Sequence, residues 1–476
     1  MDSLSFPGFA LSRDIFTALL SILYGIAFLN AYFQFPPLLG EGGLLPAPVF
    51  LKHSSFKDSP SLFHLHYSDR FLRSLCLVGM LLSGVLLWGS FNSLPLWVSL
   101  GGWLTLYVLY LSIVNIGQVF YSFGWESMLL EAGFIAAFLG GHGWVPNWIP
   151  VFFLRWMLFR TELGAGLIKL RGDRCWRDLS ALFYHHETQP MPNPLSRTFH
   201  QAPQWFHQGG VLFSHFVQLI IPFGVFFPQP IAGISGALII IHQMILVVSG
   251  NYSWLNWLTI ALGVSCFQSD GGSLRDQESW FFSLQVLFGL LALTLSWRPL
   301  LNLFSRAQKM NYCWNRYHLI GAYGAFGSVT KKRYEIILEG LWQGEWKEIP
   351  FKAKPVALDQ RPPQYAPYHL RLDWLMWFLP FSVQVSEGQI FVWGHERWFL
   401  EFLLRIFQRD SATLGLLKRE KIPEGVPAEI RGKFYHYEFT NRKEARQSRQ
   451  IWKRHYLGEY LPAVTPEKLK SVLMKN

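Results

Sequence analysis

The chain has 476 residues, of which 51% are hydrophobic and only 15% charged, and its formal net charge is +11. This composition excludes a disordered chain and an ordinary soluble enzyme, in which about a quarter of the residues are charged. Residues 1–296 contain 13 basic and 14 acidic residues, whereas residues 297–476 contain 29 and 17, so the excess lies in the last part. A single basic globule that binds nucleic acid is therefore excluded. The pattern predicts a membrane domain over residues 1–304 and a polar domain over residues 305–476.

Nine apolar segments predict membrane-spanning helices, because a span needs about 20 mostly apolar residues. The first segment follows one Arg and two Asp rather than a basic leader, so we expect it to remain as a span and not to be removed as a signal peptide. The segments are 15–35, 71–91, 94–123, 127–139, 148–159, 211–227, 231–248, 254–267 and 280–297. The predicted fold class is a multi-pass α-helical membrane domain with about nine spans.

The sidedness of the polar parts follows from the number of spans. With nine spans, the intervals 36–70 and 160–210 and the C-terminal domain lie on one side of the membrane. That side carries most of the Lys and Arg, so the positive-inside rule predicts that it is cytoplasmic. Because the rule applies weakly to long loops and domains, this reasoning leaves the side open.

Charged residues inside the predicted spans are the first functional candidates. Glu126 and Glu131 lie near the start of the fourth span, and Arg155 and Arg160 lie in or beside the fifth. Ionisable groups cost a few kcal/mol at membrane depth unless they are paired or wetted. We expect either Glu–Arg pairs that fix the packing of the helices or a polar cavity at the centre of the bundle.

The polar interval 160–210 holds the densest cluster of polar side chains in the membrane domain. Gly164 and Gly166 permit close approach of another backbone, and three prolines within 189–194 predict a stiff, extended segment. The candidate functional residues of this interval are Arg171, Asp173, Arg174, Trp176, His185, Glu187, Gln189 and Asn193.

Beyond residue 304 the hydrophobic pattern changes to short alternating strands. Residues 334–339 and 346–352 predict a hairpin around Gln343-Gly344, and 390–393 and 433–440 predict further strands. Helices are expected over 396–407 and 442–454, which makes the domain β-rich α+β or β-sandwich-like. The aromatic, Pro-rich segment 361–377 is a candidate binding segment, and it carries Arg361, Arg371, Asp373 and Trp374.

Six stretches of the chain together resemble one known family. They are Gly164–Asp178, Glu187–Pro194, Ser249–Thr259, Tyr121–Gly133, Arg361–Trp377 and Leu457–Pro462. They closely resemble the lipase maturation factor family, in the same order and over nearly the whole chain. The resemblance implies a multi-pass protein of the endoplasmic reticulum membrane that helps secreted homodimeric lipases reach their active form, with its polar domains in the lumen. In a bacterial source the corresponding membrane would be the cytoplasmic one.

A shorter stretch offers an alternative interpretation. Ala165–Leu170, with Trp176 downstream, is similar to a segment of vitamin K-dependent γ-carboxylases, and that likeness implies Lys169 as a general base on a lipid-soluble substrate. A lysine can act so only if burial or neighbouring cations such as Arg171 and Arg174 lower its pKa. The simpler expectation is an ion pair between Lys169 and Asp173 on one helix face.

The remaining reactive residues predict little further chemistry. Among the four cysteines there is no C-x-x-C pair, although Cys175 and Cys313 could form a disulfide on an oxidising side. His185 and His186 adjoin Glu187, but adjacent histidines on a strand or loop point apart, so no metal is expected. No cofactor motif is present. We therefore expect a maturation factor rather than an enzyme, with a secreted, lipase-like client and membrane lipid as partners, and no nucleic acid.

Overall fold

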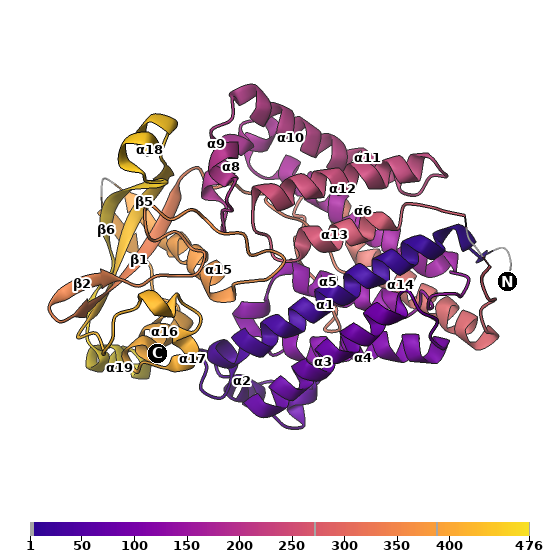
Figure 1. Ribbon diagram of the computed structural model, residues 1–476, viewed down its shortest axis with the longest axis horizontal. Helices are drawn as coiled ribbons and strands as arrows, with labels where there is room; N and C mark the ends of the chain where they lie inside the picture. Colours follow the sequence, from indigo (N-terminus) through magenta and orange to yellow (C-terminus); the bar gives the residue numbers. More distant parts are fainter. Residues whose placement is uncertain (1–3, 271–272, 387–388, 476) are drawn as a thin grey trace.

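The computed structural model describes residues 4–270, 273–386 and 389–475. Figure 1 shows an elongated molecule with a bundle of helices at one end and a β-sheet with short helices at the other. The bundle is formed by the first part of the chain, up to helix α14, and the sheet domain begins at β1.

Each of the nine predicted spans overlaps a helix, although the sixth, 211–227, extends beyond the end of its helix at Leu219. These helices are α1 (Ala10–Leu39), α3 (Asp69–Gly89), α4 (Leu96–Val114), α5 (Gly124–Ala136), α6 (Trp148–Arg171), α10 (Gln204–Leu219), α12 (Ile231–Ser249), α13 (Leu255–Val264) and α14 (Ser279–Phe304). Within the described residues, five of them (α1, α3, α4, α12 and α14) are long and apolar enough to cross a membrane. The other four are too short or, like α6, carry too many charges.

The connections between these helices correct two expectations. The third predicted span ends at Val114, because Gly117 and the positive φ of Gln118 interrupt the helix. The polar interval begins inside a helix, since α6 continues to Arg171. The remaining short helices of the bundle are α2 (Ala47–His53), α7 (Arg174–Arg177), α8 (Ala181–Thr188), α9 (Ser196–His200) and α11 (Ile221–Gly224).

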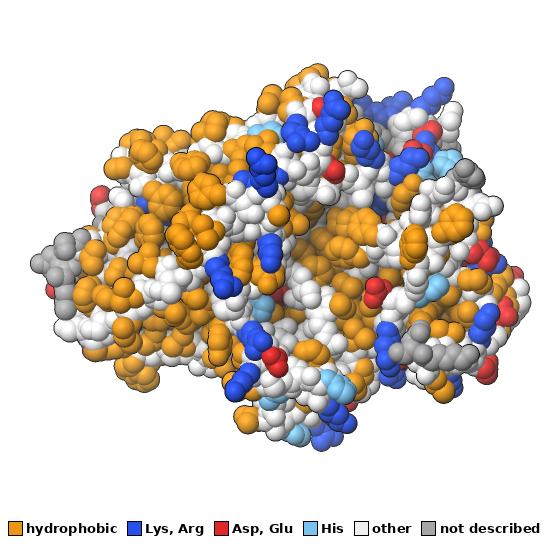
Figure 2. All heavy atoms as spheres, turned by 180° about the vertical axis from the view of Figure 1, so that it is seen from behind, with side chains coloured by type: hydrophobic (Ala, Val, Ile, Leu, Met, Phe, Trp, Pro, Cys, Tyr) orange, Lys and Arg blue, Asp and Glu red, His pale blue; other side chains and the backbone are white. Residues whose placement is uncertain are grey.

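The helices pack around α1, which contacts α3, α5 and α13. At the contact with α3, a Cβ on Gly79 would lie 2.6 Å from the ring of Phe28, so only glycine allows this approach. The outer faces of α3 and α14 expose Leu81, Leu287 and Leu293. Figure 2 shows hydrophobic side chains spread over this end of the molecule, as expected for a surface that lipid covers.

The C-terminal domain is α+β, with one four-stranded antiparallel sheet in the order β2-β1-β5-β6. Its strands are β1 (Arg333–Trp342), β2 (Glu345–Glu348), β5 (Ile430–Phe439) and β6 (Trp452–Val464), and β3 (Val383–Ser386) pairs with β4 (Gln389–Val392). The predicted hairpin is present, since Gln343 and Gly344 both have positive φ, as a two-residue turn requires. The packed second sheet of a sandwich is absent from the described residues.

Five helices flank this sheet, and two predicted elements of the domain are shorter than expected. They are α15 (Arg371–Phe378), α16 (Arg397–Phe407), α17 (Ser411–Leu414), α18 (Arg442–Ser448) and α19 (Pro466–Lys475). The helix expected over 442–454 ends at Ser448, because Arg449 adopts a left-handed conformation and β6 then pairs with β5. The strand expected over 346–352 ends at Glu348, two residues before Pro350.

A buried ion pair joins the two domains. Arg371 Nη1 of α15 lies 2.7 Å from Glu126 Oε1 of α5, and neither side chain is exposed to solvent. Arg371 also donates to Asn30 Oδ1 of α1 at 2.9 Å and lies over the ring of Tyr121. A Glu–Arg pair was expected for Glu126 from the sequence. Its partner, Arg371, was not expected, because it lies in the other domain.

The other intramembrane charges follow the predicted pairing in part. Glu131 pairs with Arg160, and it also accepts from the hydroxyl of Tyr323 at 2.7 Å. Arg155 instead donates to the backbone carbonyls of Ser265 and Val225 at 2.9 and 3.1 Å. Within the described residues no carboxylate pairs with Arg155.

Removing one partner of the Glu126–Arg371 pair should destabilise the protein strongly, because the other charge stays buried and unpaired. We expect Arg371→Met and Glu126→Gln each to lower the free energy of unfolding by about 3–5 kcal/mol, and the double variant to lose less than the sum. Denaturant unfolding of the full chain in detergent measures this. Arg361→Met, in the same segment but exposed, is the control, and equal stability of Arg371→Met and Arg361→Met would contradict the role of the pair.

Candidate functional site

The first half of the polar interval anchors the segment that connects the two domains. Arg171 Nη1 donates to Gln308 Oε1 at 2.6 Å, and Asp173 Oδ2 accepts from the backbone N–H of Val329 at 2.7 Å. Trp176 is buried, and its indole N–H donates to the carbonyl of Phe326 at 2.8 Å. Arg174 is exposed. Three of these four candidates thus hold residues 305–330 against α6 and α7.

Gly164 has the close backbone neighbour that the sequence predicted. The neighbour is the carbonyl of Tyr323 in the connecting segment, and a Cβ on Gly164 would overlap with it. The same segment is held there by Gln308, whose amide donates to the carbonyl of Gly164 at 3.0 Å.

The second half of the interval contacts the sheet domain. Arg333 of β1 donates to the carbonyl of Gln189 at 2.6 Å, and Glu187 Oε2 accepts from the N–H of Phe439 at 2.7 Å. Asn193 Nδ2 lies 3.2 Å from Gln364 Oε1. The side chains of Glu187, Gln189 and Asn193 are buried, so they position the domains and cannot touch a folded client directly.

The segment 361–377 is also largely buried, contrary to the expectation that a packed core does not require it. Arg371 and Asp373 are enclosed, and Asp373 Oδ1 accepts from the N–H groups of Ala353 and Lys354 at 2.7 and 3.0 Å. Trp374 is buried as well. Arg361 is exposed and donates to the carbonyl of Pro194. This segment therefore joins the domains more than it presents a surface.

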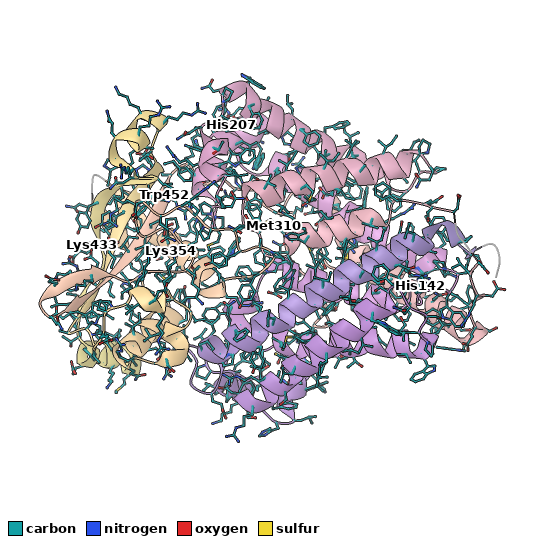
Figure 3. All side chains as sticks on the ribbon, in the orientation of Figure 1. His142, His207, Met310, Lys354, Lys433 and Trp452 are labelled. Atoms are coloured by element: carbon teal, nitrogen blue, oxygen red, sulfur yellow. The ribbon has the colours of Figure 1, made fainter. Side chains whose placement is uncertain are left out.

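An open cleft of about 810 Å³ lies where the two domains meet. We call it the interdomain cleft. Its walls come from the start of α5, the end of α8, the connecting segment and α15 with the following turn. Its Phe, Tyr and Trp residues are Phe123, Trp125, Tyr252, Phe326, Trp374, Trp377, Phe378 and Phe381. Figure 2 shows one face of the molecule, with a hollow near its middle and hydrophobic side chains around the hollow. Figure 3 places Met310, a lining residue of the cleft, between the bundle and the sheet. None of the described lining residues is Lys, Arg, Asp or Glu.

A second, smaller cavity of about 350 Å³ lies inside the bundle and contains Lys169. We call it the bundle cavity. Lys169 Nζ donates to Gln218 Oε1 at 2.7 Å and to Ser214 Oγ at 3.1 Å. The expected pair with Asp173 is therefore wrong, because Lys169 points into the bundle. His185 lines both cavities, whereas Glu126 lines neither.

The histidine and cysteine candidates lie in helices or packed loops. His185 and His186 are on α8, not on a strand or loop, and His185 Nε2 lies 2.9 Å from the hydroxyl of Tyr252. Among the described residues no group of three or more His, Cys, Asp or Glu is arranged to hold a metal ion. Cys175 and Cys313 are both free thiols, so the disulfide considered above is not formed.

Several residues that build the junction were missed in the sequence. Asn251 is buried, and its Oδ1 accepts from the N–H groups of Tyr365 and Ala366 at 2.8 and 2.9 Å. Glu335 pairs with Arg333 and Lys354 at 2.5 and 2.7 Å inside the sheet domain, where Figure 3 labels Lys354. The position of Asn251 within the stretch 249–259 was the one available signal, since that stretch carried part of the family resemblance.

Comparisons with known proteins agree with this arrangement of two joined domains. The family model described as the lipase maturation factor transmembrane domain matches residues 11–272, and the one described as the lipase maturation factor C-terminal domain matches residues 319–462. The chain belongs to the lipase maturation factor family. The resemblance predicted from the sequence is confirmed, and the membership together with the five apolar helices makes the chain an integral membrane protein.

The relatives match over nearly their whole length. The chain is 37% identical to lipase maturation factor 1 of Homo sapiens, covering 97% of this chain and 89% of that protein. It is 35% identical to lipase maturation factor 1 of Bos taurus, covering 97% and 90%. Lipase maturation factor 2 of Homo sapiens is 25% identical, covering 96% and 83%. No solved structure matches the chain.

Substitution of Gly164 should disturb the connecting segment. We expect Gly164→Ala to lower the free energy of unfolding by about 1–3 kcal/mol, because the added methyl group must push the carbonyl of Tyr323 away. Gly84→Ala on α3, where an added Cβ meets nothing within 4 Å, is the matched control and should be neutral or stabilising. Thermal unfolding followed by tryptophan fluorescence compares the two, and equal midpoints would contradict the close approach.

Glu187 should make the stability of the domain junction depend on pH. Burial raises the pKa of this carboxyl to about 7, although the N–H of Phe439 acts in the opposite direction. Between about pH 4.5 and pH 7 the folded protein keeps a proton that the unfolded chain has lost, so stability falls as the pH rises.

We therefore expect the stability of wild type relative to Glu187→Gln to fall by about 3 kcal/mol from pH 4.5 to pH 7.5. His200 Nε2 lies 3.4 Å from Glu187 Oε2, and burial lowers the pKa of His200 to about 4. Its titration makes stability rise with pH, and it does so in both proteins. The comparison thus isolates Glu187. Parallel pH profiles of the two proteins would show that folding does not raise the pKa of the Glu187 carboxyl.

Proposed function

We propose that the protein is a membrane-embedded maturation factor for secreted lipases and that the interdomain cleft receives an apolar segment of the folding client. The family membership and the names of the relatives support the first part. The observation that carries the second part is an aromatic cleft open to solvent, formed by both domains.

The lining of the cleft suits an incompletely folded chain. Phe378, Phe381 and Met310 line it and remain exposed, so they offer apolar area that the protein itself does not bury. Asn311 adds an exposed amide group that can pair with the backbone of an extended segment. Because the described lining has no formal charge, burial of an apolar client segment leaves no charged group without water.

We propose that the cleft faces the lumen of the endoplasmic reticulum, where secreted clients fold. Glu187 and Gln189 contact the sheet domain directly, which supports placing this part of the polar interval and the sheet domain on one side of the membrane. Helices α5, α6, α10 and α13 would supply the remaining four of about nine spans, as short or tilted segments enclosed by the five apolar helices.

The enzyme alternative, with Lys169 as a general base, has less support. The names of the relatives describe maturation factors, and Lys169 already donates to Gln218 and Ser214. The polar residues of the interval and of segment 361–377 act in this proposal as positioning residues, which hold the walls of the cleft in place.

A pair of matched phenylalanines tests the cleft. Phe381 lines it and is 55% exposed, whereas Phe391 on β4 is 54% exposed and lies outside it. We expect Phe381→Ser to reduce the secreted activity of a homodimeric lipase roughly tenfold, as loss of an aromatic anchor in a binding site does. Phe391→Ser should leave it unchanged.

The measurement is lipase activity in the medium of cells that lack their own maturation factor and express the full chain with the lipase. Immunoblots of both proteins show whether the variants accumulate equally. If Phe381→Ser supports full lipase activity at wild-type expression, the cleft does not receive the client.

A further inference from the structure

The bundle cavity has a polar floor that the proposed function does not use. Glu162 and Lys169 of α6 lie on it, joined through Gln218, whose Nε2 donates to Glu162 Oε2 at 3.2 Å while its Oε1 accepts from Lys169. Gln243 Nε2 of α12 donates to Glu162 Oε1 at 2.6 Å. All four side chains are buried. Such a network is costly in a bundle of helices unless it serves binding or packing.

This floor has hydrogen-bonding capacity left over. Gln243 Oε1 and His242 Nδ1 are buried, line the cavity and have no partner among the described residues. Lys169 donates two of its three N–H bonds, to Gln218 and Ser214, and its Nζ also lies 4.6 Å from the centre of the Trp176 ring. The groups without a hydrogen-bond partner are an acceptor, an imidazole nitrogen that can donate or accept, and the third N–H of Lys169, which matches a ligand with hydroxyl and carbonyl oxygens.

The rest of the wall is apolar, and its outer part faces the membrane. Phe206 of α10 and Ile245 of α12 line the cavity and are exposed, as is Trp205 next to them. Because Ile245 is exposed on α12, one of the helices able to cross a membrane, this part of the cavity wall lies beside the acyl chains of the bilayer. A ligand can therefore place a polar head on the floor and an apolar chain in the bilayer.

We propose that the bundle cavity binds a neutral single-chain amphiphile, such as a monoacylglycerol, with its hydroxyl and ester oxygens on the floor formed by Lys169, Gln243 and His242. The floor carries one cation and one anion, so an anionic head would meet Glu162 and a cationic head would meet Lys169. The volume of about 350 Å³ is at the small end of ligand sites and suits one chain rather than a two-chain phospholipid. This site differs from the client cleft, although His185, Leu255, Asn311 and residues 324–326 line both cavities.

Photolabelling of the full chain in lipid nanodiscs tests the proposal. The probe is a monoacylglycerol with a diazirine in its acyl chain, and the labelled residues are identified by mass spectrometry. We expect labels on the parts of α10 and α12 that line the cavity. Unlabelled monoacylglycerol should compete at least fivefold better than a fatty acid or a phosphatidylcholine.

Two matched glycines supply the variants. Gly209 of α10 lines the cavity, Gly101 of α4 does not, and an added Cβ meets nothing within 4 Å at either position. Gly209→Trp should reduce cavity labelling at least fivefold, while Gly101→Trp should match wild type, with thermal unfolding as the check that both fold. Equal labelling of both variants, labels only on the outer faces of α3 and α14, or equal competition by the fatty acid would overturn the proposal.

Discussion

The ion pair between Glu126 and Arg371 determines how the membrane domain and the sheet domain fit together. Both side chains are fully enclosed, and each would cost several kcal/mol if it were left alone in the interior. Any arrangement that moves α15 away from α5 leaves two such charges without partners. The Arg333 side chain donates a hydrogen bond to the carbonyl of Gln189, and the N–H of Phe439 donates one to Glu187. These bonds further restrict how the two domains are oriented. The pair therefore specifies one orientation of the two domains.

This orientation creates the interdomain cleft. Phe123 and Trp125 come from the bundle next to Glu126, whereas Trp374 and Trp377 come from the helix that begins with Arg371. The aromatic walls thus stand on the same two helices that the ion pair joins. The buried polar residues of the interval 160–210 act on the cleft indirectly, because they hold the connecting segment and the sheet in place. The aromatic side chains thus form the binding surface, and buried polar groups support it, although Gln189 and Gln308 belong to both sets.

Hydropathy was sufficient to predict the nine main helices of the bundle, because each apolar run overlaps one, and Gln343-Gly344 was sufficient to predict the hairpin. Helices α2, α7, α8, α9 and α15 were not predicted, since they contain no long apolar run. A helix was predicted over 442–454, but its last residues form the start of β6, because pairing of β6 with β5 overrides the local preference. The candidate site was harder to predict from the sequence, since polar residues such as Glu187 and Asp373 were expected on a surface. They are buried because each satisfies backbone groups of a distant segment, and a single sequence does not reveal such long-range pairs.

The central claim is that a lipase client occupies the cleft that the two domains form. A photo-crosslinking amino acid in place of Phe381, with Phe391 as the matched exposed position, tests it in membranes from cells that synthesise a secreted lipase. The account predicts a crosslink to newly made lipase from position 381 and none from position 391. Equal crosslinking from both positions, or crosslinking from position 391 alone, would contradict it.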